Sequence, residues 1–275
     1  MRNALTIDVE DYFQVESFKS LVKFESWEQF ALRVEANVDR LLAILEEEQI
    51  RCTFFVLGWI ADRAPQVVRR IHGQGHEVAS HGYAHQMVTG QTPGEFRDDI
   101  HKAKSILEDI TGEGILGYRA PTFSVTRNTF WALDALVEEG FLYDSSVFPV
   151  RHDRYGIPDW TQYITRVQLR NGASILEVPP LTAKVLGTNI PLGGGGYFRL
   201  APLWLSRWAI LRFNSVGHPA VIYLHPWEID ASQPRFPLPP LQRFRHYVNI
   251  ETTERKLRRL LAGARFTSVR NVLSL

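Results

Sequence analysis

Short apolar runs alternate with amphipathic stretches along most of this chain. The runs predict β-strands at residues 5–9, 53–57, 77–79, 115–118, 141–143, 175–178 and 220–224. Between the first two runs, apolar residues recur at helical spacing, as at Val34, Val38, Leu41 and Leu45. Strands that alternate with helices are typical of a parallel sheet, so the pattern predicts an α/β fold of about seven βα units.

Helix-start signals support this alternation. Ser26 carries a capping-box pattern and predicts the first helix start. Pro65 and the pair Thr92-Pro93 predict two further starts, because proline is well tolerated in the first turn of a helix. Gly112 predicts the end of the helix that starts at Pro93, since glycine is common just past the last helical turn.

The pattern loses its regularity in residues 147–172, which we interpret as an insertion of loops with a hairpin. No linker separates two parts of the chain. We therefore predict a single domain over residues 1–275, with an elaborated C-terminal third; the alternative is a domain boundary near residue 150. Its core motifs span residues 6–225, and an extension begins at about residue 226.

Composition narrows the class of protein. The 275 residues carry a net charge of +1, which gives no argument for binding nucleic acid or an anionic membrane. The longest apolar candidate, residues 201–216, falls short of the roughly 20 residues of a membrane span and contains Arg207 and Arg212. We expect a cytoplasmic protein without a membrane span, because the N-terminus does not have the pattern of a signal peptide. Cys52 lies in an apolar run and is predicted to be a buried, inert thiol, and the oligomeric state stays open.

Ionisable side chains follow the predicted strands. Because the carboxyl ends of parallel strands meet at one edge of a sheet, these side chains are expected to gather at one rim. They are Asp8, Glu10 and Asp11 at the first strand, His81 and His85 after the third, Arg119 after the fourth, Asp144 after the fifth and His225 after the last.

Two histidines and a carboxylate predict a metal site. His81 and His85 are four residues apart, so a helical turn would bring both imidazoles to one side, as two ligands of a zinc-like ion require. Asp8 and Glu10 point to the same face of a strand, where one can bind the metal while the other takes a proton from water. Asp11 is an alternative ligand if the chain bends after Val9.

The other strand-end residues suit supporting roles. The guanidinium of Arg119 is expected at the mouth of the site, where it can hold a carboxylate ionised and oriented. Asp144 lies in a segment that resembles a turn or a helix cap. His225 ends an apolar strand and is expected to act as a general acid.

These segments resemble the polysaccharide deacetylases of carbohydrate esterase family 4, which share the NodB homology domain. Five motifs of that family occur in order: Thr6-Ile-Asp-Val-Glu10, Ser80-His-Gly-Tyr-Ala-His85, Arg119-Ala-Pro-Thr-Phe123, Asp144-Ser-Ser and Leu224-His225. The resemblance implies a deformed (β/α)7 barrel with a bound divalent metal, usually zinc. It also implies that Asp8 is the catalytic base and that His81 and His85 are metal ligands.

Two positions depart from the family pattern. Many relatives have adjacent aspartates in the first motif, whereas position 9 here is valine, so the carboxylate ligand is assigned to Glu10. Phe123 stands where an aromatic hydroxyl is common, and its backbone N–H is expected to serve the oxyanion. The segments 8–13, 194–199 and 225–228 are similar to a subfamily from exopolysaccharide loci linked to the exosortase (PEP-CTERM) sorting system.

The resulting hypothesis is removal of acetyl groups from N-acetylated sugars of a polysaccharide. Asp8, held by Arg119, takes a proton from water, and His225, oriented by Asp144, protonates the leaving amine. Phe123, Tyr197 and Trp227 are expected to contact the sugar.

Two other functions stay open. One is hydrolysis of a small amide or a cyclic imide such as allantoin on the same fold. The other is glycan binding without catalysis. The glycines at 193–196 allow either the close approach of a ligand or a tight turn.

Overall fold

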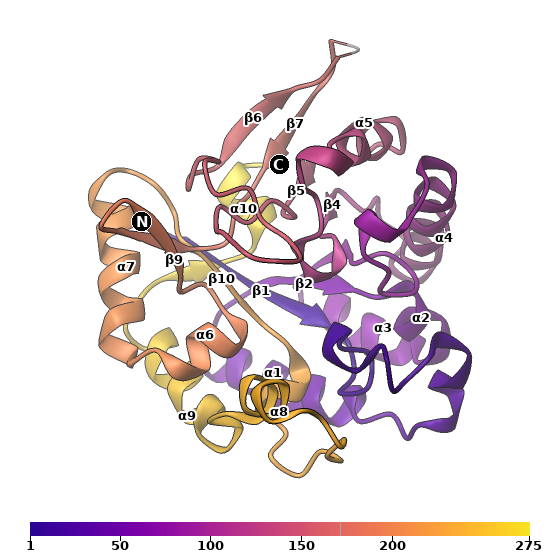
Figure 1. The fold of residues 1–275 in the computed structure, drawn as a ribbon, viewed down its shortest axis with the longest axis horizontal. Coiled ribbons are helices and arrows are strands. Elements are labelled where there is room, and N and C mark those ends of the chain that lie inside the picture. Colours follow the sequence, from indigo (N-terminus) through magenta and orange to yellow (C-terminus); the bar gives the residue numbers. More distant parts are fainter. Residues whose placement is uncertain (171) are drawn as a thin grey trace.

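In the described chain, seven consecutive parallel strands make up most of one curled sheet of nine strands (Figure 1). The computed structural model describes residues 1–170 and 172–275. Across the sheet the strands lie in the order β10 (Val221–Leu224), β1 (Asn3–Val9), β2 (Thr53–Val56), β3 (Glu77–Ser80), β4 (Gly117–Tyr118), β5 (Tyr143–Asp144) and β7 (Ser174–Glu177). Their mutual pairing is parallel throughout, so the predicted α/β architecture is confirmed.

Other segments extend the sheet and cover its open side. Strand β6 (Thr165–Gln168) pairs antiparallel with β7, and β11 (Phe266–Thr267) pairs with the start of β1. Between β7 and β10 the closure is made by loop contacts: the N–H of Leu181 donates to Val221 O (2.9 Å) and the N–H of Tyr223 donates to Gly193 O (2.8 Å). This incomplete closure makes the fold a deformed barrel, as expected.

The glycine run at 193–196 allows two backbones to approach each other. A Cβ atom on Gly194 would lie 2.1 Å from the carbonyl oxygen of Tyr223, which no other residue type could accommodate. The Gly194 backbone forms a parallel bridge with Tyr223 of β10. Close packing against β10 therefore accounts for Gly194 without a ligand.

Helices follow most strands and cover the outside of the sheet (Figure 1). They are α1 (Val34–Glu47), α2 (Gly58–Arg63), α3 (Pro65–Gly73), α4 (Pro93–Thr111), α5 (Trp131–Glu138), α6 (Gly195–Leu200), α7 (Leu203–Ser215), α8 (Pro240–Tyr247), α9 (Ile250–Leu261) and α10 (Val269–Leu273). Helix α4 has the predicted ends: Thr92 and Glu95 form a capping box, and Gly112 follows in the left-handed conformation.

The predicted start of the first helix at Ser26 is wrong. Residues Phe24–Gln29 form a 3-10 helix, in which the Ser26 hydroxyl donates to Lys23 O, and α1 begins only at Val34. The N-terminus of α1 is instead capped from a distant loop, because Asp11 Oδ2 accepts hydrogen bonds from the N–H groups of Arg33 (2.6 Å) and Val34 (2.9 Å). A cap supplied from another part of the chain leaves no local sequence signal.

The hairpin expected within residues 147–172 is only partly confirmed, because β6 lies inside that segment but its partner β7 begins beyond it at Ser174; Asn171 lies outside the described residues. A second hairpin, β8 (Thr182–Val185) with β9 (Thr188–Pro191), was not predicted. Cys52 is buried as expected, and burial raises the pKa of its thiol well above the usual value, which keeps the thiol protonated and inert.

Candidate active site

The carboxyl ends of β1, β3, β4 and β10 meet around a small cavity, as the strand order requires. The cavity has a volume of about 180 Å³. Its lining includes Asp8, Glu10, His81, His85 and His225, which the sequence placed at one rim. Their convergence follows from parallel pairing in register, since β1 lies between β10 and β2, and β3 lies next to β2.

Glu10, His81 and His85 form a cluster that can hold a metal ion. One ligand atom from each residue lies within 4.8 Å of those of the other two, and all three side chains are buried. Glu10 Oε2 is 2.8 Å from His85 Nε2 but accepts no hydrogen bond of good geometry. A buried acceptor without a donor is costly, and a cation between the three groups would satisfy it.

The surroundings prepare these groups for metal binding. His81 Nδ1 is 2.7 Å from the carbonyl oxygen of Arg119, which leaves its Nε2 free, the usual arrangement for an imidazole ligand. Burial lowers the pKa of His81 to about 4, so the ring is neutral at pH 7. Burial alone would raise the pKa of Glu10, but His85 and His225 outweigh it and hold that pKa well below its usual range. A neutral imidazole and an ionised carboxylate are the forms that bind metals.

The geometry favours Glu10 over Asp11 as the acidic ligand. Both carboxylate oxygens of Asp11 accept backbone hydrogen bonds: Oδ2 caps α1, and Oδ1 accepts from Tyr12 N (2.8 Å). These bonds turn the Asp11 carboxylate towards the helix, so it does not belong to the cluster of Glu10, His81 and His85.

Asp8 is held by Arg119 in a buried ion pair. Arg119 Nη1 donates to Asp8 Oδ1 (2.6 Å) and to Thr6 Oγ1 (2.8 Å), while Nη2 donates to Ser145 Oγ (2.8 Å). The guanidinium also lies over the ring of Phe55, 4.2 Å from its centroid. Arg119 is fully buried, so its expected position at the mouth of the site is wrong: it lies beneath Asp8 and supports it.

The expected contact between Asp144 and His225 is absent among the described residues. Asp144 is fully buried beside Glu177, and it accepts a hydrogen bond from Ser146. Ser146 Oγ in turn accepts from Ala120 N (2.7 Å). The Asp144-Ser-Ser motif therefore supports the backbone around Arg119, and its aspartate does not orient the histidine.

Asp144 and Glu177 are expected to share one proton. Asp144 Oδ2 and Glu177 Oε2 are both buried without a hydrogen-bond donor, and burial raises the pKa of both carboxyl groups. The folded state then binds this proton more tightly than the unfolded state. The contribution of this pair to the free energy of unfolding should therefore fall as the pH rises above 4.5, the ordinary pKa of glutamate.

Glu177→Gln tests this pair, because glutamine can donate to Asp144 as the protonated acid does. Urea unfolding at several pH values should show that the wild type loses stability relative to Glu177→Gln as pH rises from 4.5 to neutrality. A difference between the two proteins that does not change with pH would contradict the shared proton.

His225 is oriented by Glu228 instead. His225 Nδ1 is 2.7 Å from Glu228 Oε1, and Arg199 Nε forms an ion pair with the other oxygen of Glu228 at 2.7 Å. The opposite ring nitrogen of His225 lies 3.4 Å from Glu10 Oε1 and 3.9 Å from Asp8 Oδ2. Burial opposes protonation of His225, but Glu10, Glu228 and Asp8 together raise its pKa to about 9.

Sequence reasoning missed Glu228 and Arg199 as site residues. Both lie in segments noted only for their similarity to a subfamily. The signal that was available is the spacing of three residues between His225 and Glu228, which a single helical turn brings together.

Glu228→Gln is expected to lower the free energy of unfolding by about 3–5 kcal/mol, because it leaves the charge of Arg199 buried and unpaired. The Arg199 and Glu228 side chains are 2% and 0% exposed, so solvent screens this pair very little. Urea denaturation measures the change. The matched control is Glu138→Gln, which removes an exposed ion pair with Arg97 and should cost under about 1 kcal/mol. Equal losses of unfolding free energy in the two variants would contradict a stabilising ion pair between Arg199 and Glu228.

The three aromatic residues expected beside the substrate differ in position. Trp227 is buried between His225 and His246, and its Nε1 donates to Glu10 Oε1 (3.1 Å), so it orients the proposed metal ligand. The N–H of Phe123 donates to Ala120 O (3.0 Å) and is therefore not free for an oxyanion, contrary to expectation.

Tyr197 keeps an exposed face. It is 38% exposed and hydrogen-bonds to Tyr155, which lines the small cavity. Phe123 and Trp227 line the small cavity itself, whereas Tyr197 lies beside the cavity-lining Tyr155 with one face exposed.

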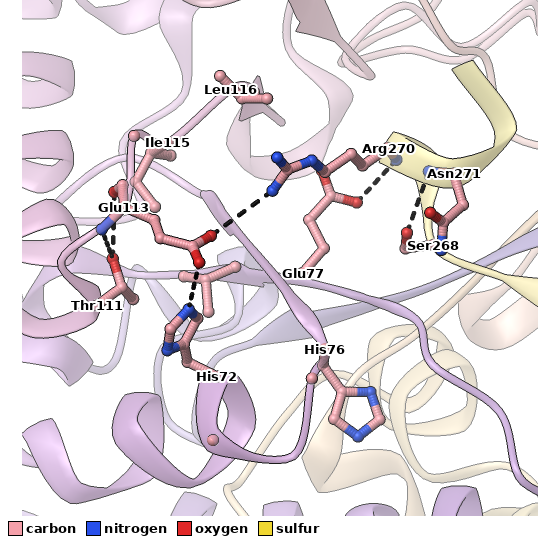
Figure 2. Close-up of a pocket in the computed structure, with 14 residues that line it drawn as sticks. His72, His76, Glu77, Thr111, Glu113, Ile115, Leu116, Ser268, Arg270 and Asn271 are labelled. Atoms are coloured by element: carbon pink, nitrogen blue, oxygen red, sulfur yellow. Dashed lines mark hydrogen bonds and ion pairs between the residues drawn. The ribbon is translucent and has the colours of Figure 1, made fainter. Parts of the chain in front are cut away.

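A larger cavity, of about 430 Å³, lies at the opposite end of the strands (Figure 2). Its charged side chains already pair with one another: Glu113 lies 3.5 Å from His72 and 3.6 Å from Arg270, and Arg270 N donates to Glu77 (2.9 Å). These pairs leave no cluster aimed at a ligand among the labelled residues. The chemistry therefore points to the smaller cavity.

The cluster of Glu10, His81 and His85 can hold a metal ion, and comparison with known proteins relates parts of the chain to two family models. Residues 25–137 match the family model for polysaccharide deacetylase, and residues 145–274 match a domain of unknown function (DUF3473). The second region contains Arg199, His225 and Glu228, so residues from both regions form the site.

One curated relative and two solved structures resemble this chain. The peptidoglycan deacetylase-like protein FGM2 of Gibberella zeae is 35% identical over 120 residues, 43% of this chain and 34% of that protein. The crystal structure of Bc1960 peptidoglycan N-acetylglucosamine deacetylase matches with a TM-score of 0.52 at 17% identity, over 98% of this chain and 86% of that one. The structure of Puue allantoinase matches with a TM-score of 0.63 at 18% identity, over 98% and 88%.

The family model over residues 25–137 and the curated relative thus support a likeness to the polysaccharide deacetylase (NodB, carbohydrate esterase 4) family, and the solved structures, at 17% and 18% identity, support the fold. The fold is the deformed barrel of that family, as the motifs implied. The match spans about a third of the length of FGM2.

Proposed function

We propose that this protein removes acetyl groups from N-acetylated sugars of a polysaccharide with the help of a divalent metal ion, zinc being the best candidate. The observation that carries the proposal is the buried cluster of Glu10, His81 and His85 beside the Asp8–Arg119 pair. Two imidazoles with one carboxylate are a donor set typical of catalytic zinc sites.

The residues present fit such an ion. Glu10 Oε2 lacks a hydrogen-bond donor, His81 presents its free ring nitrogen, and Trp227 fixes the second oxygen of Glu10. When bound, the metal would supply a Lewis acid and make water a better nucleophile at neutral pH. The role of the protein is to hold the ligands, to move protons and to orient the acetamide.

Asp8 and His225 would handle the two protons of the reaction. Arg119 binds Asp8 Oδ1 and leaves Oδ2 to take a proton from the attacking water. Glu228 and Asp8 both raise the pKa of His225, which favours a protonated ring that can donate a proton to the amine as it leaves. Glu228 holds that imidazole in position, which is the role we first expected of Asp144.

The finer substrate assignment rests on the sequence resemblance. We propose an exopolysaccharide as the substrate, because residues 194–199 and 225–228 resemble the exosortase-linked subfamily. We also propose that residues 1–275 act as one domain, since residues from both matched regions meet at a single site. Tyr197, exposed at the edge of the site, would contact the sugar chain.

Two alternatives make different predictions. The likeness to an allantoinase structure keeps a small-amide hydrolase open, and a glycan-binding protein would bind sugar without hydrolysis. Purified protein should release acetate from chitooligosaccharides, lose that activity on treatment with a chelator and regain it with zinc.

Comparison with allantoin in the same assay separates the alternatives. Hydrolysis of allantoin without release of acetate would favour the amide hydrolase. Sugar binding without either reaction, in zinc-loaded protein, would favour the binding protein. Acetate release that survives complete metal removal would contradict the metal's role.

A further inference from the structure

Helix α7 exposes a second apolar face in addition to the one it buries. Its buried residues are Ser206, Ala209, Ile210 and Phe213, which face the core. On the opposite side lie Trp204, Trp208 and Leu211, with 68%, 39% and 67% of their surface exposed. Their spacing of four and three residues places them in one stripe along the helix.

Arginines border this stripe on both sides. With 3.6 residues per turn, Arg207 and Arg212 lie to either side of the Trp204–Leu211 line, and both are exposed. The guanidinium of Arg212 sits 5.7 Å from the ring centroid of Trp208. Within the described chain, neither arginine has a carboxylate at ion-pair distance.

A basic groove adjoins the start of α7. This groove, of about 270 Å³, lies between the α6–α7 junction and α9, and Leu203, Arg255, Lys256 and Arg259 are among its lining residues. Among the described residues, no aspartate or glutamate lines this groove. Arg255 and Arg259, one helical turn apart and exposed, have no ion-pair partner in the part of the chain described.

The net charge of the whole chain conceals this local excess of basic residues. Residues 178–227 contain no aspartate or glutamate, whereas they include Lys184, Arg199, Arg207 and Arg212. The expectation drawn from a net charge of +1, that nothing favours an anionic membrane, therefore does not hold for this face.

We propose that the α7 face and the adjoining groove dock the protein on the surface of an anionic lipid bilayer. Tryptophan and leucine would enter the interfacial layer, and the flanking arginines would contact lipid phosphates, as in amphipathic helices that lie in a membrane plane. None of the helices in the described chain combines the length and apolar character that crossing a bilayer requires, so docking would be peripheral.

The charge pattern argues against a second copy as the occupant. In a two-fold dimer the same face would meet itself, which would bring Arg207 and Arg212 against their equivalents with no carboxylate nearby. A sugar chain is a poorer fit as well, since Leu211 in the stripe offers no flat ring face and no acidic or amide side chain alternates with the tryptophans.

Vesicle sedimentation tests the proposal. The full chain should bind vesicles of phosphatidylcholine with about one-third phosphatidylglycerol, bind pure phosphatidylcholine weakly, and lose affinity as salt is raised. The Trp204→Ser/Trp208→Ser variant should bind at least about tenfold more weakly. Arg255→Gln and Arg259→Gln should each weaken binding to the anionic vesicles about fivefold.

Controls keep the surface separate from the fold and from the active site. Leu142→Ser changes an exposed leucine (46%) elsewhere and should bind like the wild type. His81→Ala should also retain vesicle binding, so docking can hold or fail independently of the deacetylase proposal. The Trp204→Ser/Trp208→Ser variant should keep its thermal unfolding midpoint, because both side chains are exposed.

Three results would overturn the proposal. One is the absence of binding to anionic vesicles at low salt. Another is a wild-type protein that forms dimers and does not bind vesicles, if the Trp204→Ser/Trp208→Ser variant is monomeric. The last is an affinity for chitooligosaccharides that depends on the two tryptophans, again without vesicle binding.

Discussion

Asp8→Asn is expected to slow acetate release by about 10²–10⁴-fold while the protein still binds its metal. Asparagine cannot accept the proton that Asp8 Oδ2 would take from water. The cluster of Glu10, His81 and His85 is left intact, because Asp8 is not one of its members. Steady-state kinetics on chitooligosaccharides, with elemental analysis of the same preparation, measures both effects.

Loss of folding must be distinguished from loss of the base. Asp8→Asn removes the charge opposite Arg119, but Arg119 keeps its bonds to Thr6 and Ser145. Circular dichroism and the unfolding midpoint should therefore show a folded, less stable protein. Near-normal turnover by Asp8→Asn on the true substrate would mean that another group is the base.

His81→Ala is expected to abolish both metal binding and activity. Losing a direct ligand should weaken metal affinity by more than the roughly 10–100-fold typical of losing an outer-shell partner. Since the metal would supply the Lewis acid, turnover should fall with it. Metal titration by calorimetry and acetate release on zinc-loaded samples measure the two losses separately.

The matched control is His101→Ala. The His101 side chain on α4 is 68% exposed and pairs with Glu139, away from the cluster. The His101→Ala variant should retain full metal content and full activity. If His81→Ala binds zinc as tightly as His101→Ala does, the metal site is elsewhere.

The general architecture and most of the site could be predicted from local sequence patterns. Apolar runs alternating with helical stretches indicate a parallel sheet, and such a sheet brings its strand ends to one edge. That rule alone predicts a shared site without knowledge of any distance. The residues that it brings into this site are Asp8, Glu10, His81, His85 and His225.

The supporting contacts could not be predicted, because they depend on loops that meet only in three dimensions. Asp11 caps a helix 22 residues away in sequence, which hides both the start of α1 and the reason that Asp11 is not a ligand. Glu228 and not Asp144 orients His225, and Arg199 reaches Glu228 from a distant helix.

X-ray diffraction at the zinc absorption edge, from crystals of zinc-loaded protein, tests the central claim most directly. We expect one strong anomalous peak between Glu10 Oε2 and the ring nitrogens of His81 and His85. The absence of a peak there, or a peak bound by other residues, would contradict it.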